Sequence, residues 1–212
     1  MKNIFKVLAI ICKHSKDFWM QMYNNYLLRF DHSKFGNIGK NVRLDAPIYW
    51  RNTDNIFLED NTHISRNSEF IIGNGKDGKF IMKANSGAAP GLVVITNGHS
   101  VKPPLEMSRY ESAVKEIGDI NKSIIVEEEV WIGANVILLP GVTVGRGAII
   151  GAGSIVTKSI PPYAIATGNP CKFRRFKYNL EEILEHEKFV FPPEKRITKE
   201  NLEEIITSYN PC

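Results

Sequence analysis

The feature that most constrains this chain is a six-residue repeat of branched aliphatic side chains in its second half. A period of six fits neither an α-helix nor a simple strand alternation, but it does fit a short strand followed by a corner. Three such units would close one triangular turn, and successive turns would stack about 4.8 Å apart through parallel ladders. The aliphatic residues would then fill the interior of a prism; they are Ile120, Val126, Ile132, Leu138, Val144, Ile150 and Val156.

A second series, four residues after the first, contains only aliphatic or small residues. We expect these side chains near the corners, where large ones would not fit. The series is Ile124, Val130, Val136, Val142, Ala148, Ser154 and Ile160. Glycine follows the aliphatic residue at Gly133, Gly145 and Gly151, as corners with unusual dihedral angles require.

The same pattern occurs upstream in three shorter runs, so the coil is expected to begin well before Ile120. Two segments interrupt it without destroying it, namely GNGKDG between Gly73 and Gly78 and a longer insertion at 100–119. An insertion that leaves the repeat intact must project from one corner. The upstream runs are Ile38, Leu44, Trp50 and Ile56; Leu58, Ile64 and Phe70; and Met82, Ala88 and Val94.

Both ends of the chain have helical rather than hexad spacing. Apolar residues from Phe18 to Leu27 follow a helical period, and Asn179 with Glu182 forms a capping pair for a second helix. A last helix is expected over 199–208. Because solenoids need covered ends, we interpret these segments as caps. The predicted organisation is a helical segment at 1–34, a β-helix at 35–170 with the protruding loop 100–119, and a helical tail at 171–212.

Composition excludes several classes of protein. The hydrophobic fraction of 43% and the charged fraction of 24% are typical of a globular chain, and the net charge of +4 is too small to indicate nucleic acid binding. The three cysteines form no C-x-x-C pair, which argues against a disulfide framework or zinc site and favours the cytoplasm. The apolar run from Ile4 to Ile11 is too short to span a bilayer and lacks a small-residue cleavage site, so we expect neither export nor a transmembrane helix.

A long stretch from Ile125 to Arg175 then matches a known family. It reads IVEEEVWIGANVILLPGVTVGRGAIIGAGSIVTKSIPPYAIATGNPCKFRR. This closely resembles the hexapeptide-repeat acyltransferases, in particular the branch with sugar O-acetyltransferases and xenobiotic acetyltransferases. The resemblance implies a mainly β fold, a left-handed parallel β-helix with short helical segments at both ends. It also implies acetyl-CoA as co-substrate.

The resemblance assigns the catalytic base to His99, which directly precedes the protruding loop. A neutral imidazole, with an ordinary pKa near ~6.5, suits removal of a proton from an acceptor hydroxyl. The alternative is an ordinary surface histidine. A related zinc enzyme with this fold needs three histidine ligands, but only His63 and His99 lie in the repeat region, so no metal is expected. We interpret His63 as a solvated corner residue.

The family also implies which residues hold the coenzyme. Backbone groups at Ala134 and Ala152 and the pair Thr157–Lys158 would contact its pantetheine arm. Cations would bind its phosphates, and within the basic cluster that includes Lys158 and Arg174, Lys172 and Arg175 match the family spacing best. Trp131 would pack on the coenzyme, against a neighbouring subunit, or simply cover a corner. A solvated basic edge is the alternative to phosphate binding.

The family implies a homotrimer, with the site in a cleft between subunits. The leading functional hypothesis is O-acetylation of a saccharide or other small-molecule acceptor in surface polysaccharide biosynthesis. A xenobiotic (antibiotic) acetyltransferase, an amino-sugar N-acetyltransferase and a non-catalytic β-helix scaffold remain as alternatives. The N-terminal segment combines lysines with Phe5, Phe18 and Trp19, so peripheral contact with a membrane is a second interpretation of that helix.

Overall fold

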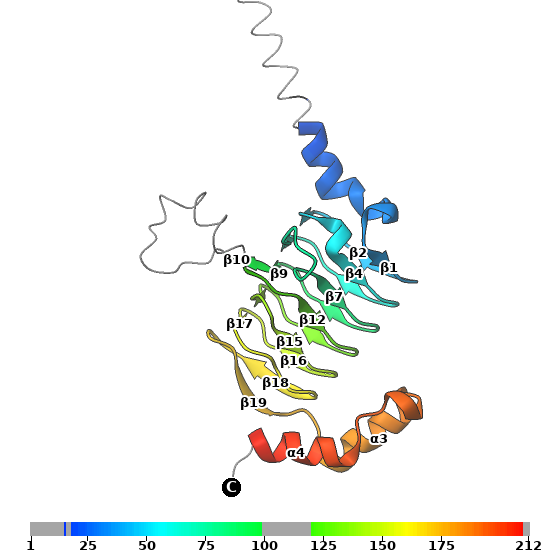
Figure 1. The fold of residues 1–212 in the computed structure, drawn as a ribbon, viewed down its shortest axis with the longest axis vertical. Coiled ribbons are helices and arrows are strands. Elements are labelled where there is room, and N and C mark those ends of the chain that lie inside the picture. Colours follow the sequence, from blue (N-terminus) through cyan, green and yellow to red (C-terminus); the bar gives the residue numbers. More distant parts are fainter. Residues whose placement is uncertain (1–14, 16–17, 99–119, 210–212) are drawn as a thin grey trace, which may run out of the picture.

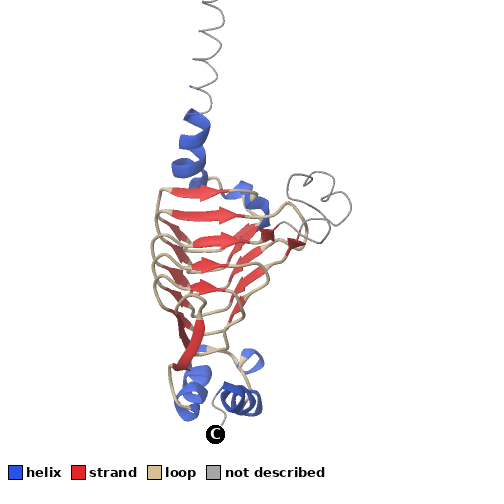
Figure 2. Ribbon diagram, turned by 90° about the vertical axis from the view of Figure 1, so that its left-hand side faces the viewer, coloured by secondary structure: helices blue, strands red, loops and turns tan. Residues whose placement is uncertain are grey.

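Three parallel sheets wrap into a triangular prism in the computed structural model, which describes residues 15, 18–98 and 120–209 (Figures 1 and 2). We call them sheets A, B and C, in the order in which the chain visits them on each turn. A helical segment stands on the first turn, and two helices lie below the last. The prediction of a mainly β, parallel β-helix with helical ends is confirmed.

Most of the strands are two or three residues long, as a six-residue period demands. Sheet A contains β1 (Asn37–Ile38), β4 (Ile56–Leu58), β7 (Phe80–Met82), β12 (Ile124–Val126) and β15 (Thr143–Val144). Sheet B contains β2 (Arg43–Leu44), β5 (His63–Ile64), β8 (Gly87–Ala88), β13 (Trp131–Ile132), β16 (Ile149–Ile150), β18 (Ala164–Thr167) and β19 (Lys172–Phe176). Sheet C contains β3 (Ile48–Trp50), β6 (Ser68–Ile71), β9 (Val93–Ile95), β14 (Ile137–Leu138) and β17 (Ile155–Val156).

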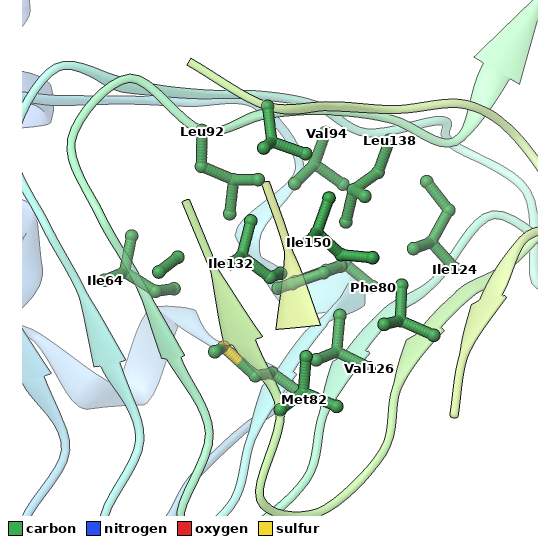
Figure 3. Packing of buried hydrophobic residues seen from close by; sticks show 14 of the residues in the cluster. Ile64, Phe80, Met82, Leu92, Val94, Ile124, Val126, Ile132, Leu138 and Ile150 are labelled. Carbon is green, nitrogen blue, oxygen red and sulfur yellow. The ribbon is translucent and has the colours of Figure 1, made fainter. Parts of the chain in front are cut away.

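From Ile124 onward, both hexad series point into the prism (Figure 3). Val126, Ile132 and Leu138 are fully buried, and so are Val136 and Ala148 from the second series. In the parallel ladder each residue faces its counterpart one turn on, for example Ile132 opposite Ile150. The second series therefore belongs to the core as much as the first does, and its smaller members fit where the prism narrows toward a corner.

The corners depend on residues that accept a left-handed backbone. At the corner between sheets A and B, Asn41, Asn61 and Asn85 have φ of 56°, 59° and 59°. Asparagine tolerates this region better than other non-glycine residues because its side chain can form local hydrogen bonds. Here the three amides also form a ladder, Asn41 donating to Asn61 at 3.1 Å and Asn61 to Asn85 at 3.0 Å.

The last turn is closed by a strand that reverses direction. β19 pairs antiparallel with β18, with a register shift between Ile165 and Ala166. The predicted boundary at residue 170 therefore falls inside a β-hairpin, and sheet B continues to Phe176.

Helices cover the C-terminal end of the prism. They are α3 (Leu180–Val190), the 3₁₀ turn η6 (Pro193–Lys195) and α4 (Lys199–Tyr209). The predicted capping pair is present, since Asn179 Oδ1 accepts from the Glu182 backbone N–H at 2.9 Å and the Glu182 carboxylate accepts in return at 2.8 Å. α4 covers the predicted range 199–208.

A buried polar cluster joins these helices to the coil. The carboxylate of Glu187 on α3 accepts hydrogen bonds from the Tyr163 hydroxyl at 2.6 Å and from Arg146 Nη1 at 3.0 Å. Arg146 also pairs with Glu128 at 3.3 Å. Burial, followed by the hydrogen bond to Glu187 and the charge of Glu187, raises the pKa of Tyr163, so its hydroxyl remains a neutral donor.

The N-terminal segment is α-helical over residues 18–22 and continues as a π-helical turn, η1 (Tyr23–Leu27). Two 3₁₀ turns follow, η2 (Leu28–Phe30) and η3 (His32–Lys34), and a further one, η4 (Thr53–Asn55), lies in the coil. None of the helices in the described ranges is long and apolar enough to cross a membrane.

Candidate active site

The protruding insertion leaves the coil at the corner between sheets C and A. Its two ends form a short antiparallel ribbon of β10 (Asn97–Gly98) and β11 (Ile120–Asn121), with Asn97 opposite Asn121. His99 follows Gly98 directly, but His99 and the loop 100–119 lie outside the described residues. The structure thus fixes the backbone on both sides of the insertion.

The shorter insertion, GNGKDG, emerges at the same corner one turn earlier and braces this ribbon. The buried hydroxyl of Thr96 accepts a hydrogen bond from the Gly73 N–H and donates one to the Gly78 carbonyl, both at 2.9 Å. The Asn121 side chain packs against Gly73, where a Cβ would collide with its Oδ1. A larger residue at this position would force the Asn121 amide to move, so the two insertions are packed against each other.

Thr157 and Lys158 lie at the same corner, two turns further along the axis. Both are exposed and directly follow β17. A spacing of about 4.8 Å per turn puts them roughly 10 Å from the turn that carries Gly98. The C–A corner therefore carries the backbone next to His99 together with one of the predicted coenzyme elements.

Ala134 and Ala152 lie at a different corner, between sheets B and C. They stack on successive turns, and the Gly153 N–H donates to the Ala134 carbonyl at 2.8 Å. Ala152 is exposed and Ala134 half-buried. Gly133 lets the turns approach closely, because a Cβ there would lie 2.6 Å from the Ala152 nitrogen. This corner offers backbone groups with little side-chain cover.

Trp131 lies beside this corner on the outer face of sheet B. Its indole covers Gly87, the residue opposite it in β8, and 49% of the residue remains exposed. Since glycine leaves room beneath the ring, Trp131 lies against the sheet and presents an apolar surface to solvent.

The predicted phosphate-binding residues Lys172 and Arg175 are both exposed on β19. Arg174, between them, is held in place by a hydrogen bond from its Nε to Thr167 Oγ1 at 2.8 Å. Thr167 ends β18 and stands one turn beyond Gly151, the residue before Ala152, next to the B–C corner. Arg174 thus extends the column of Ala134 and Ala152, and family spacing did not single it out. The irregular pairing of β18 with β19 that places Arg174 there cannot be recognised in the sequence.

The predicted site residues therefore form two groups on opposite edges of sheet C. Thr157 and Lys158 share the C–A corner with Gly98, whereas Ala134 and Ala152 lie at the B–C corner, and Trp131, Lys172 and Arg175 lie on sheet B. Within one chain, β14 and β17 separate the groups. A ligand that touched both groups would have to cross this face or lie between two copies of the chain.

Two other groups bear on the chemistry. His63 lies within β5 rather than at a corner, so the interpretation as a solvated corner residue is wrong; its Nε2 is 2.9 Å from Asp45 Oδ2 and lowers the pKa of that carboxyl. The Cys171 thiol is buried, and burial raises its pKa, which makes it a poor nucleophile. Within 18–98 and 120–209, no three side chains lie together as a metal site would require.

Comparison with known proteins agrees with the coil geometry. Residues 123–158 match the family described as "Bacterial transferase hexapeptide (six repeats)". The galactoside O-acetyltransferase of Lactococcus lactis is 35% identical over 144 residues, which cover 68% of this chain and 56% of that protein. The resemblance predicted from the sequence is confirmed. This is a hexapeptide-repeat chain with the fold of the hexapeptide-repeat acetyltransferases.

Further relatives extend the likeness. The galactoside O-acetyltransferase of Escherichia coli is 32% identical to this hexapeptide-repeat chain over 142 residues, covering 66% of it and 64% of the relative. The chain thus matches less than two thirds of the length of these relatives. A maltose O-acetyltransferase structure from Clostridium difficile has a TM-score of 0.61 at 28% identity, covering 80% of this chain and 88% of that one. A galactoside acetyltransferase in complex with coenzyme A has a TM-score of 0.59 at 23% identity, covering 87% of each chain, and shows the shared fold.

Proposed function

We propose that this chain transfers the acetyl group of acetyl-CoA to a hydroxyl of a saccharide, in the cytoplasm, during the synthesis of surface polysaccharide. The observation that carries the proposal is the similarity to galactoside O-acetyltransferases from two bacteria, over about two thirds of this chain. The maltose O-acetyltransferase structure supports the same acceptor class, because it too is named for a sugar.

In this mechanism His99 acts as general base. Its neutral imidazole takes the proton of the acceptor hydroxyl while the hydroxyl oxygen attacks the thioester carbonyl. The carbon–sulfur bond then breaks, the sugar ester forms, and the coenzyme thiolate takes up a proton as it leaves. No acyl-enzyme is needed, so binding both substrates in one orientation supplies much of the rate enhancement.

The coenzyme is proposed to bind along the backbone of Ala134 and Ala152 and at Thr157–Lys158. Trp131 would pack on it, and Lys172 and Arg175 would neutralise its phosphates. We add Arg174 to this set, because its hydrogen bond to Thr167 holds a guanidinium in line with the two alanines. A fixed, planar cation suits a phosphate group better than a free side chain does.

The split of these residues between two corners supports a homotrimer. In a ring of three parallel prisms, the C–A corner of one copy can face the B–C corner of the next. Each site would then combine His99, Thr157 and Lys158 from one subunit with Ala134 and Ala152 from its neighbour. Such a closed, heterologous arrangement would give three equivalent sites.

The test is release of free thiol from acetyl-CoA in the presence of galactosides, maltose, nucleotide-linked amino sugars, chloramphenicol and a streptogramin. We expect release with a sugar hydroxyl as acceptor. His99→Asn should lower kcat by about 10²–10⁴-fold, the usual contribution of a general base. His32→Asn is the matched control, since His32 is exposed and lies in η3, before the first strand of the coil.

Release only with an amino sugar or only with an antibiotic would overturn the sugar hydroxyl as acceptor in favour of the corresponding alternative. If acetyl-CoA failed to bind at all, catalysis itself would be ruled out, and the chain would act as a scaffold.

A further inference from the structure

The N-terminal end of the molecule carries an unusual concentration of exposed apolar side chains. Ten large hydrophobic residues are exposed in the described part of the chain, and six of them lie between Phe18 and Phe30. We call these six the N-terminal apolar surface: Phe18, Trp19, Met20, Tyr26, Leu27 and Phe30. Four of them, Phe18, Trp19, Tyr26 and Leu27, belong to the apolar face that was expected to cover the first turn of the coil, so most of that predicted face points away from it.

The inner side of the same segment packs against the coil. Leu28 is buried, Tyr23 packs against the core and donates a hydrogen bond to Asp31 at 2.9 Å, and Arg29 Nη1 donates to the Leu44 carbonyl at 2.9 Å. The segment is therefore anchored, and Figure 1 shows that it stands out from the end of the prism. No residue in the described part of the chain buries its apolar surface.

The net charge of the chain is concentrated in the same N-terminal part of the sequence. Residues 1–34 contain six lysines and arginines against two acidic residues, whereas the whole chain contains 27 and 23. The remaining residues therefore hold 21 of each, and the entire net charge of +4 belongs to this end. The cations are Lys2, Lys6, Lys13, Lys16, Arg29 and Lys34.

We infer that the N-terminal apolar surface docks on an anionic lipid membrane. Aromatic side chains with lysines and arginines beside them are the composition of segments that lie at the boundary between headgroups and acyl chains. A protein partner or a second copy would account for the exposed apolar residues. Neither explains why the entire net positive charge of the chain comes from residues 1–34.

Docking would hold the coil close to the lipid surface. The turn that carries Gly98 is the third from this end, and at about 4.8 Å per turn it stands roughly 10 Å beyond the first. The docking itself rests on the described side chains and the charge distribution and does not depend on the proposed reaction.

The test is co-sedimentation of the full chain with vesicles of pure phosphatidylcholine and of phosphatidylcholine mixed with phosphatidylserine. We expect binding to the mixed vesicles that weakens as salt is raised. Replacing Lys13 and Lys16 with glutamine should weaken it by about fivefold for each lysine at low salt. The double variant Phe18→Ser, Trp19→Ser should weaken binding about tenfold or more at any salt concentration.

Phe189→Ser is the matched control, because Phe189 is 90% exposed but lies on α3 at the opposite end. It should bind vesicles as the unaltered chain does. Failure of the unaltered chain to bind the mixed vesicles, or full binding by the Phe18, Trp19 double variant, would overturn the inference. If that double variant instead lost its oligomeric state in size-exclusion chromatography with light scattering, while the unaltered chain ignored vesicles, this surface would be a contact between copies.

Discussion

At the scale of single residues, the Glu187 carboxylate determines how the C-terminal helices are held. Only 1% of its side chain is exposed, and it accepts hydrogen bonds from Tyr163, Arg146 and the backbone N–H of Ile197. The Arg146 guanidinium also stacks 4.0 Å from the centre of the Phe191 ring. A buried charge with this many partners is costly to leave unpaired.

Glu187→Ala should therefore destabilise the protein strongly. It leaves the Arg146 charge, whose side chain is only 12% exposed, with a single carboxylate partner, and the expected loss is about 3–5 kcal/mol. Urea unfolding at a fixed protein concentration measures it. Glu185→Ala, an exposed position on the same helix, should cost no more than about 0.5 kcal/mol, and equal losses in the two variants would refute this role for Glu187.

Glu128 should make stability depend on pH in the acid range. Burial alone would raise the pKa of Glu128, but a backbone N–H and the charges of Arg146 and Lys83 outweigh burial and hold that pKa below its usual value. A carboxyl whose pKa is lowered in the folded state stabilises the protein above its unfolded pKa. That contribution is lost as the pH falls through the folded pKa.

Measured as the midpoint of urea unfolding, stability should fall as the pH drops below about 5 and through the lowered pKa of Glu128, and Glu128→Gln should reduce this fall. An identical pH profile for the variant would show that other groups cause the acid instability.

Some of this residue-level detail was predictable. The capping pair Asn179–Glu182 follows from local spacing, and the structure contains it. The position of Arg174 was not predictable, because it depends on an irregular pairing between two strands. The Glu187 cluster joins residues about 40 positions apart in sequence, and only the folded last turn brings them together.

At the scale of elements, close stacking of the turns explains the glycines that follow the aliphatic positions. A Cβ at Gly133 would lie 2.6 Å from the Ala152 nitrogen, and one at Gly145 would lie 2.5 Å from the Pro162 nitrogen. Gly133→Ala and Gly145→Ala should each cost about 1–3 kcal/mol, because the turns must move apart.

The two glycine variants should differ in coenzyme affinity. Only Gly133→Ala displaces the backbone at the B–C corner, so it alone should raise the Kd for acetyl-CoA, measured by calorimetry. Gly145→Ala is the matched control, since its clash occurs at the A–B corner. If both variants, or neither, changed the Kd, Ala152 would not be a coenzyme contact.

The hexad period was sufficient to predict the sheets and the core, because every turn repeats one rule about which side chain points inward. The hexad period could not predict how the coil ends. The hairpin of β18 and β19 reverses the chain direction through a turn at 168–171, and the N-terminal helix turns much of its predicted apolar face outward. Both depend on what surrounds the end of the solenoid rather than on the repeat.

At the scale of the whole molecule, the separation of the two residue groups by sheet C makes a prediction about subunits. His99→Ala and Ala152→Phe should each inactivate the enzyme, the second by covering the B–C corner. Mixed in equal amounts by unfolding and refolding together, the two variants should recover about a quarter of full activity, because one site in four would combine two unaltered halves. If each site lay within a single chain, no activity would return.

Acetyl transfer to a sugar hydroxyl with His99 as the base is tested most directly by following a ¹³C-labelled acetyl group from acetyl-CoA to a galactoside by NMR. We predict an O-acetyl resonance on the sugar that is sensitive to hydroxylamine, absent with His99→Asn and retained with His32→Asn. A label that stayed on the coenzyme, or that reached the sugar equally well without His99, would contradict it.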